Sequence, residues 1–187
     1  MKVAEFVKTT TLEWEGMISS VIVISEQGDE IETATGYLAE RKGMIDGVII
    51  DSVESSSPKE LISLLKDLRS SGLRIRIVTD GKAPDVLDDL IGACYVDSVM
   101  VRLDGGIDAN MERTLSLLSD YGIDCEYRTV LNSRNVTKED IVMYAKAIKG
   151  ARRYVLIQSK KDPFKKKDAL EAAEAAKRYV KNAVIRQ

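Results

Sequence analysis

Short apolar runs alternate along the chain with amphipathic stretches of helical spacing. Residues 21–25 and 47–51 are nearly continuous in apolar side chains, which is typical of strands covered on both faces of a parallel sheet. Leu61, Leu64 and Leu65, by contrast, recur at the spacing of a buried helix face. The pattern predicts strands at residues 21–25, 47–51, 73–79, 96–103, 123–131 and 154–158, with a last short strand at 183–186.

Helix start and stop signals frame the amphipathic stretches. Ser57 stands before Pro58 and Glu60, which supplies a hydroxyl cap, a first-position proline and an acidic first turn. Thr137 and Asp140 have the spacing of a capping pair. Glycines close several of the stretches, as expected at helix C-termini. The predicted helices cover residues 35–42, 57–72, 83–91, 108–121, 137–149 and 168–181.

The order of a strand followed by a helix occurs six times, which predicts an α/β protein with a parallel sheet. Six units suit an open, partial (βα)6 barrel of TIM-barrel-like type, or a doubly wound sheet. A full eight-unit barrel typically takes ~250 residues, whereas this chain has 187. That length, with no linker or low-complexity tract, predicts one domain over residues 1–187.

Composition excludes several classes of chemistry. The chain has no histidine and two cysteines, and its net charge is −2. Histidine-dependent triads and most zinc sites are therefore excluded, and the charge argues against nucleic-acid binding. No apolar run reaches the roughly 20 residues that span a bilayer. We expect no signal peptide, no membrane association and a reducing, cytoplasmic location.

Candidate chemistry gathers where the predicted strands end, because ligands of parallel α/β proteins bind at the carboxyl ends of the strands. Carboxylates and arginines there suit a small polar ligand, although polar loops also end every parallel sheet without any function. We assign no catalytic residue and no metal ligand. Glu26, Asp29 and Glu30 form either a weak divalent-cation site or a solvated acidic loop. The candidate ligand-binding residues are Asp51, Glu54, Thr79, Asp80, Arg102, Asp104 and Arg128.

Several segments resemble one family along nearly the whole chain. Residues 6–21 read FVKTTTLEWEGMISSV, residues 79–81 read TDG, and residues 127–130 read YRTV. Residues 149–156 and 178–182 read KGARRYVL and RYVKN. These segments resemble the radical S-adenosylmethionine activating proteins, the activases of anaerobic ribonucleotide reductase and pyruvate formate-lyase. The resemblance implies a radical-SAM-like partial barrel and a role in activating glycyl-radical enzymes.

The motifs that hold the family's cofactors are changed in this chain. The family's CxxxCxxC, whose thiolates hold an iron–sulfur cluster, aligns with Asp29, Thr33 and Gly36. Its GGEP segment aligns with residues 52–55, where only Glu54 matches, and its MDIKAP strand aligns with Arg102 and Asp104. Carboxylates do not replace thiolates in such clusters. We therefore expect no 4Fe-4S cluster and no radical activase activity.

Three hypotheses follow from this combination. The first is a degenerate, non-catalytic relative that docks on a protein partner, either a glycyl-radical enzyme or an activase. The second is a small-molecule site at the carboxyl ends of the strands, for S-adenosylmethionine, a nucleotide or a metal, including a non-radical enzyme. The third is a structural subunit that assembles with itself.

Overall fold

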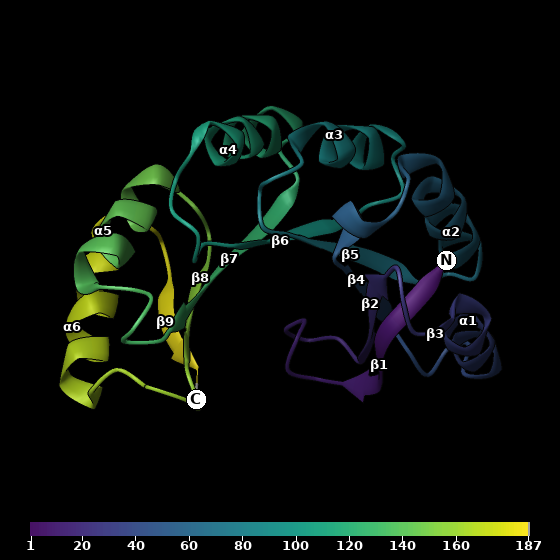
Figure 1. Cartoon of the computed structure of the whole chain (residues 1–187), viewed down its shortest axis with the longest axis horizontal. Helices are drawn as coiled ribbons and strands as arrows, with labels where there is room; N and C mark the ends of the chain where they lie inside the picture. The colour runs from purple at the N-terminus through teal and green to yellow at the C-terminus, as the bar shows by residue number, and fades with distance from the viewer. Residues whose placement is uncertain (187) are drawn as a thin grey trace. The chain divides into compact units, whose positions relative to one another are not determined.

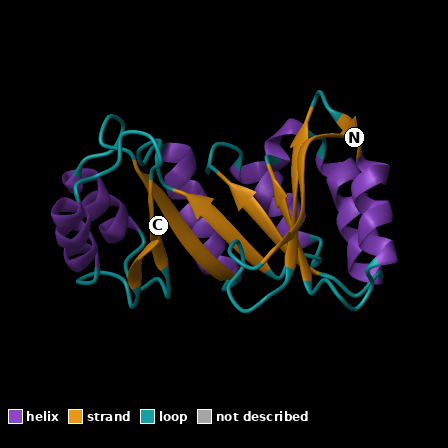
Figure 2. Ribbon diagram, turned by 90° about the horizontal axis from the view of Figure 1, so that it is seen from below, coloured by secondary structure: helices purple, strands orange, loops and turns teal. Residues whose placement is uncertain are grey.

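Strands and helices alternate along a computed structural model that describes residues 1–186. The contacts between residues divide the chain into two compact units. Unit 1 comprises Met1–Thr79 with Asp85–Val99, and unit 2 comprises Asp80–Pro84 with the chain from Met100 onward. Figures 1 and 2 show the helices of each unit beside its strands. Among residues 1–186, none of the helices has the length and apolar character needed to cross a membrane.

Unit 1 carries the first half of the elements. Its strand order is β3-β1-β2-β4-β5, with β2, β4 and β5 parallel, while β1 runs antiparallel to both β2 and β3. The elements are β1 (Lys2–Thr10), β2 (Ser19–Ser25), β3 (Asp29–Glu30), α1 (Ile31–Glu40), β4 (Gly47–Asp51), the 3₁₀ turn η1 (Val53–Ser55), α2 (Pro58–Ser70), β5 (Arg74–Thr79) and α3 (Pro84–Gly92).

Unit 2 carries the second half. Strand β6 crosses the division between the units and is followed in order by β7, β8 and β9, and the pairs β7–β8 and β8–β9 are parallel. Helices α4, α5 and α6 lie on one side of these strands in Figure 1. The elements are β6 (Ser98–Arg102), α4 (Ala109–Tyr121), β7 (Asp124–Leu131), α5 (Lys138–Ala147), β8 (Tyr154–Gln158), α6 (Lys166–Ala176) and β9 (Ala183–Arg186).

The helix-capping residues predicted from the sequence form the expected hydrogen bonds. The Ser57 hydroxyl accepts a hydrogen bond from the Glu60 amide at the start of α2. Thr137 and Asp140 form a reciprocal capping box at the start of α5. These caps satisfy amides that the first helical turn leaves without partners. Both predicted helix starts are confirmed.

The tryptophan of unit 1 is packed between an arginine and the start of β4. Trp14 is buried, and the guanidinium of Arg76 lies 4.6 Å from the centre of its ring. Arg76 also donates to the carbonyl oxygen of Glu13 at 3.2 Å and to the Ser98 hydroxyl at 3.2 Å. A Cβ added to Gly47 would lie 3.0 Å from the Trp14 ring, so the ring would have to shift by a few tenths of an ångström to admit a larger residue.

The prediction of an open, partial barrel built from six parallel βα units is wrong. Residues 1–186 contain nine strands, and the two that were missed, β1 and β3, are antiparallel. Strand β1 mixes charged and apolar positions and is mostly half-buried or exposed, so its periodicity is weak. Hydrogen bonding to β2, and not the sequence pattern, is what identifies β1 as a strand. The helix predicted at 35–42 begins earlier, at Ile31.

Candidate functional site

The carboxyl ends of β4 and β5 bring two candidate residues together in unit 1. Ser52 has a left-handed backbone (φ 60°), which turns the chain sharply out of β4 into η1. The neighbouring Val53 is buried and anchors this turn. As a result, the Glu54 carboxylate accepts a hydrogen bond from the buried Thr79 hydroxyl at 3.0 Å. Asp51 accepts a bond from the Ser52 hydroxyl at 3.3 Å.

Asp80 and Arg102 belong to unit 2. The amide of Lys82 donates to the Asp80 carboxylate at 3.1 Å, and the Lys82 ammonium forms an ion pair with it. Partial burial acts to raise the pKa of Asp80, but the bonds from Lys82 and the charge of Arg102 outweigh it and lower that pKa. The Asp80 side chain is therefore a carboxylate at neutral pH. Asp104 is exposed just beyond β6.

The turn after Asp104 leads to α4. The Gly106 amide donates to the Tyr144 hydroxyl at 3.2 Å, which ties the turn to α5. Burial raises the pKa of Tyr144, the Gly106 amide opposes that rise, and the charges of Asp140 and Asp104 add to it. Asp104 thus lies close enough to Tyr144 to affect its titration.

Arg128 is buried in the middle of β7 and pairs with a residue that the sequence analysis did not single out. Its Nε donates to the buried Glu126 carboxylate, and the other oxygen of Glu126 lies 3.3 Å from Nε of Arg153. The signal was present in the sequence, because residues two apart on a strand share a face. Two opposite charges at that spacing on one predicted strand indicate an ion pair.

The segment after β2 is folded into regular structure. Gly28 has φ +131°, and a Cβ there would lie 2.0 Å from the Val3 carbonyl oxygen, so only glycine allows β3 to pair with β1. The hydrogen bond and charge of Lys2 lower the pKa of Glu30. Asp29 then lies in β3, whereas Thr33 and Gly36 lie in α1.

This segment does not fit the iron–sulfur cluster that the family resemblance implies. Its side chains offer oxygen donors, whereas cluster iron is held by thiolates. The chain's two cysteines lie elsewhere: Cys94 follows α3 in unit 1, and Cys125 lies in β7 in unit 2. Among residues 1–186, no group of three or more Cys, Asp or Glu side chains is arranged to hold a metal ion.

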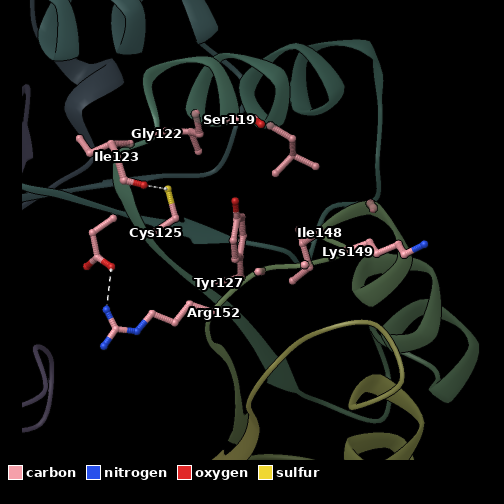
Figure 3. Close-up of a pocket in the computed structure, with 14 residues that line it drawn as sticks. Ser119, Gly122, Ile123, Cys125, Tyr127, Ile148, Lys149 and Arg152 are labelled. Carbon is pink, nitrogen blue, oxygen red and sulfur yellow. Dashed lines mark hydrogen bonds and ion pairs between the residues drawn. The ribbon is translucent and has the colours of Figure 1, made fainter.

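Two hollows lie at the opposite, amino ends of the strands. One, of about 600 Å³, is lined in unit 1 by residues including Met17, Gly43 and Arg74. The other, of about 590 Å³, lies in unit 2 over the start of β7 (Figure 3). Neither is lined by a candidate ligand-binding residue. The hollows and the predicted site residues are therefore separate features.

Known proteins show only distant sequence similarity to this chain. No model of a known protein family matches it. It is 25% identical, over 169 aligned positions, to a protein of Methanocaldococcus jannaschii that carries the provisional name of glycyl-radical enzyme activating enzyme. That alignment covers 75% of this chain and 70% of the archaeal protein. The chain is thus distantly similar to the family that its sequence motifs resemble.

A solved structure shares the fold. The type I 3-dehydroquinate dehydratase of Clostridium difficile superposes with a TM-score of 0.56 and 18% identity, over 88% of this chain and 73% of that one. At this identity the match concerns the fold alone. It overturns the prediction of a radical-SAM-like partial barrel. The chain is an α/β protein with a mostly parallel sheet, distantly similar in sequence to a glycyl-radical enzyme activating enzyme.

Proposed function

We propose that this protein is a relative of the glycyl-radical enzyme activating enzymes that performs no radical chemistry and binds a protein partner. One observation carries the proposal. The segment aligned with the family's cluster motif forms β3 and the start of α1 and contains carboxylates and hydroxyls in place of thiols. A chain with this donor set has no family-like route to a cluster, while the sequence similarity favours a role beside a glycyl-radical enzyme.

Anaerobic reconstitution with iron and sulfide tests the first half of the proposal. We expect the purified protein to retain no stoichiometric iron and to lack the visible absorption of an iron–sulfur cluster. A triple variant, Asp29→Cys, Thr33→Cys and Gly36→Cys, is the matched control because it restores thiols at the aligned positions. Stoichiometric iron and sulfide in the unmodified chain would contradict the proposal, whatever the variant does.

Exposed apolar side chains in unit 1 support the second half. Leu12 is 70% exposed and Met44 is 67% exposed. Met44 follows Gly43, which lines the hollow of unit 1 together with Met17. Exposed apolar side chains mark an interaction site where they gather in one patch, whereas single ones are common on any protein surface. Leu12 and Met44 are therefore separate candidate contacts for a glycyl-radical enzyme or for an active activase.

Binding to a purified glycyl-radical enzyme and to an active activase can be measured by biolayer interferometry. We expect Leu12→Lys and Met44→Lys each to weaken binding by roughly tenfold or more, the effect of burying a charge in an interface. Leu170→Lys is the control, since Leu170 is 51% exposed on α6 in unit 2. Absence of binding to either enzyme, with self-association in light scattering, would instead favour the structural subunit.

The bond between Glu54 and Thr79 favours a second candidate function, a small-molecule site at the carboxyl ends of β4 and β5. Glu54 matches the family motif that contacts S-adenosylmethionine, and the buried Thr79 hydroxyl orients its carboxylate. Thermal-shift titrations with S-adenosylmethionine, nucleotides and divalent metals test this function. A ligand present at ~100 times its dissociation constant adds about 2.7 kcal/mol of stability.

The second function predicts a shift that Glu54→Gln removes and that Glu112→Gln, an exposed control on α4, retains. Flat titrations with every ligand would leave only the partner-binding proposal. Failure of the first function and failure of the second can be told apart, because iron reconstitution tests one and thermal shifts test the other.

A further inference from the structure

The hollow of unit 2 has the size of a small-molecule site. Its volume is about 590 Å³, and it lies between the C-terminal ends of α4 and α5, over the first residues of β7 (Figure 3). Leu115, Leu118 and Ile148 contribute apolar walls. Sites for small organic ligands usually measure roughly 300–1,000 Å³ and combine apolar walls with a few polar groups.

The polar group at its floor is the hydroxyl of Tyr127. Tyr127 is 9% exposed, and its hydroxyl points into the hollow in Figure 3. Its side chain forms a hydrogen bond with the Cys125 side chain, and sulfur is a weak hydrogen-bond acceptor. Burial raises the pKa of Tyr127, and the nearby Cys125 thiol adds to the rise, so the phenol stays protonated. Buried tyrosine hydroxyls usually have a partner, and a ligand oxygen in the hollow would be a stronger acceptor than this sulfur.

Three charged residues, Asp124, Lys149 and Arg152, line the hollow beside its apolar walls. The charged end of Lys149 extends away from Tyr127 in Figure 3, and Arg152 is directed to Asp124, 4.0 Å away at the rim. The carbonyl ends of α4 and α5 both face this region, and helix C-termini disfavour anions. The Cys125 thiol donates to the Ile123 carbonyl oxygen at 3.3 Å.

We propose that this hollow binds an uncharged, mostly apolar ring compound whose carbonyl oxygen accepts a hydrogen bond from Tyr127. The ring lies between Leu118 and Ile148, and its oxygen takes the hydrogen bond that the phenol otherwise shares with the Cys125 sulfur. This site is independent of the partner-binding function, because it uses other residues at the other end of the strands.

Three probes of similar shape test the class of ligand: neutral benzamide, anionic benzoate and cationic benzylamine. In a Cys94→Ser variant, Cys125 is the single thiol, so its alkylation by iodoacetamide reports occupancy of the hollow. We expect benzamide to slow that alkylation by about twofold at a concentration equal to its dissociation constant. In a Cys125→Ser variant, where exposed Cys94 is the single thiol, benzamide should leave the rate unchanged.

The Tyr127→Phe variant tests the hydrogen bond. We expect benzamide to bind it about fivefold more weakly, the effect of losing one neutral hydrogen bond, whereas Tyr179→Phe should bind as the wild type does. Comparing benzamide, benzoate and benzylamine on the Cys94→Ser variant tests the proposal even if Tyr127→Phe does not fold. Equal protection by benzoate or benzylamine, or no protection by benzamide, would overturn the proposal.

Discussion

At the scale of single residues, Thr79 and Glu54 form the best-defined contact among the residues chosen from the sequence. Thr79→Val keeps the shape of the side chain but removes the donor at 3.0 Å from Glu54. We expect the free energy of unfolding to fall by about 1–2 kcal/mol, since Thr79 is buried and its bond is to a carboxylate. Urea denaturation measures the change.

Thr33→Val is the control for that substitution, because Thr33 is exposed on α1. Its free energy of unfolding should stay within about 0.5 kcal/mol of the wild type. Equal losses in the two variants would mean that the contact between Thr79 and Glu54 contributes nothing specific.

Asp80 makes a pH-dependent contribution to stability. Its pKa in the folded chain is lowered from 3.8, despite partial burial, by the bonds from Lys82 and the charge of Arg102. The folded state therefore binds this proton less readily than the unfolded state. The stabilisation is complete above the unfolded value and is lost as the pH falls through the lowered folded value.

Substituting Asp80→Asn should therefore lower stability at neutral pH by less than about 1 kcal/mol, since the ion pair is largely exposed. The difference from the wild type should shrink as the solution is made acidic. Urea denaturation across a pH series checks this. A difference that stays constant down to the acid limit would contradict the assigned lowering of the Asp80 pKa.

At the scale of elements, the connection between β2 and α1 depends on one glycine. Gly28→Ala places a Cβ 2.0 Å from the Val3 carbonyl oxygen at φ +131°. We expect a loss of about 1–3 kcal/mol in the free energy of unfolding, because the backbone must shift and β3 must part from β1. Circular dichroism in urea measures the loss.

Gly36 provides the matched substitution in the next element. It lies inside α1, and a Cβ there meets nothing within 4 Å. Gly36→Ala should stabilise the chain by up to about 1 kcal/mol, because alanine favours the helix. If both alanine variants changed stability in the same direction, the close approach of Gly28 to β1 would not be the controlling contact.

At the scale of the whole molecule, the single-domain prediction for residues 1–187 stays open to test. The contacts divide the chain into two units, and its one tryptophan, Trp14, lies in unit 1. Tryptophan fluorescence therefore reports on unit 1, whereas far-ultraviolet circular dichroism reports on both. One cooperative domain predicts coincident urea transitions for the two signals. Separate midpoints would mean that the units unfold independently.

Much of the local structure was predictable because its causes lie within a few residues. The capping pairs at Ser57 and Thr137 and the apolar run at 47–51 act through neighbouring backbone groups, and the structure has a helix or strand at each. The ion pair between Glu126 and Arg128 was equally local but was missed. Predicting it required pairing two opposite charges that lie two residues apart on one predicted strand.

The residue types present limit the chemistry of this chain before any fold is known: it has no histidine, and the segment aligned with the cluster motif has no thiol. Most strand and helix positions were also predictable, since periodicity and capping are short-range. Three features appear only in the folded chain: β1 and β3 pair antiparallel, Arg153 joins Glu126, and Tyr127 faces a hollow between α4 and α5. Strand pairing and cavities arise between residues far apart in the chain, so no short window of sequence records them.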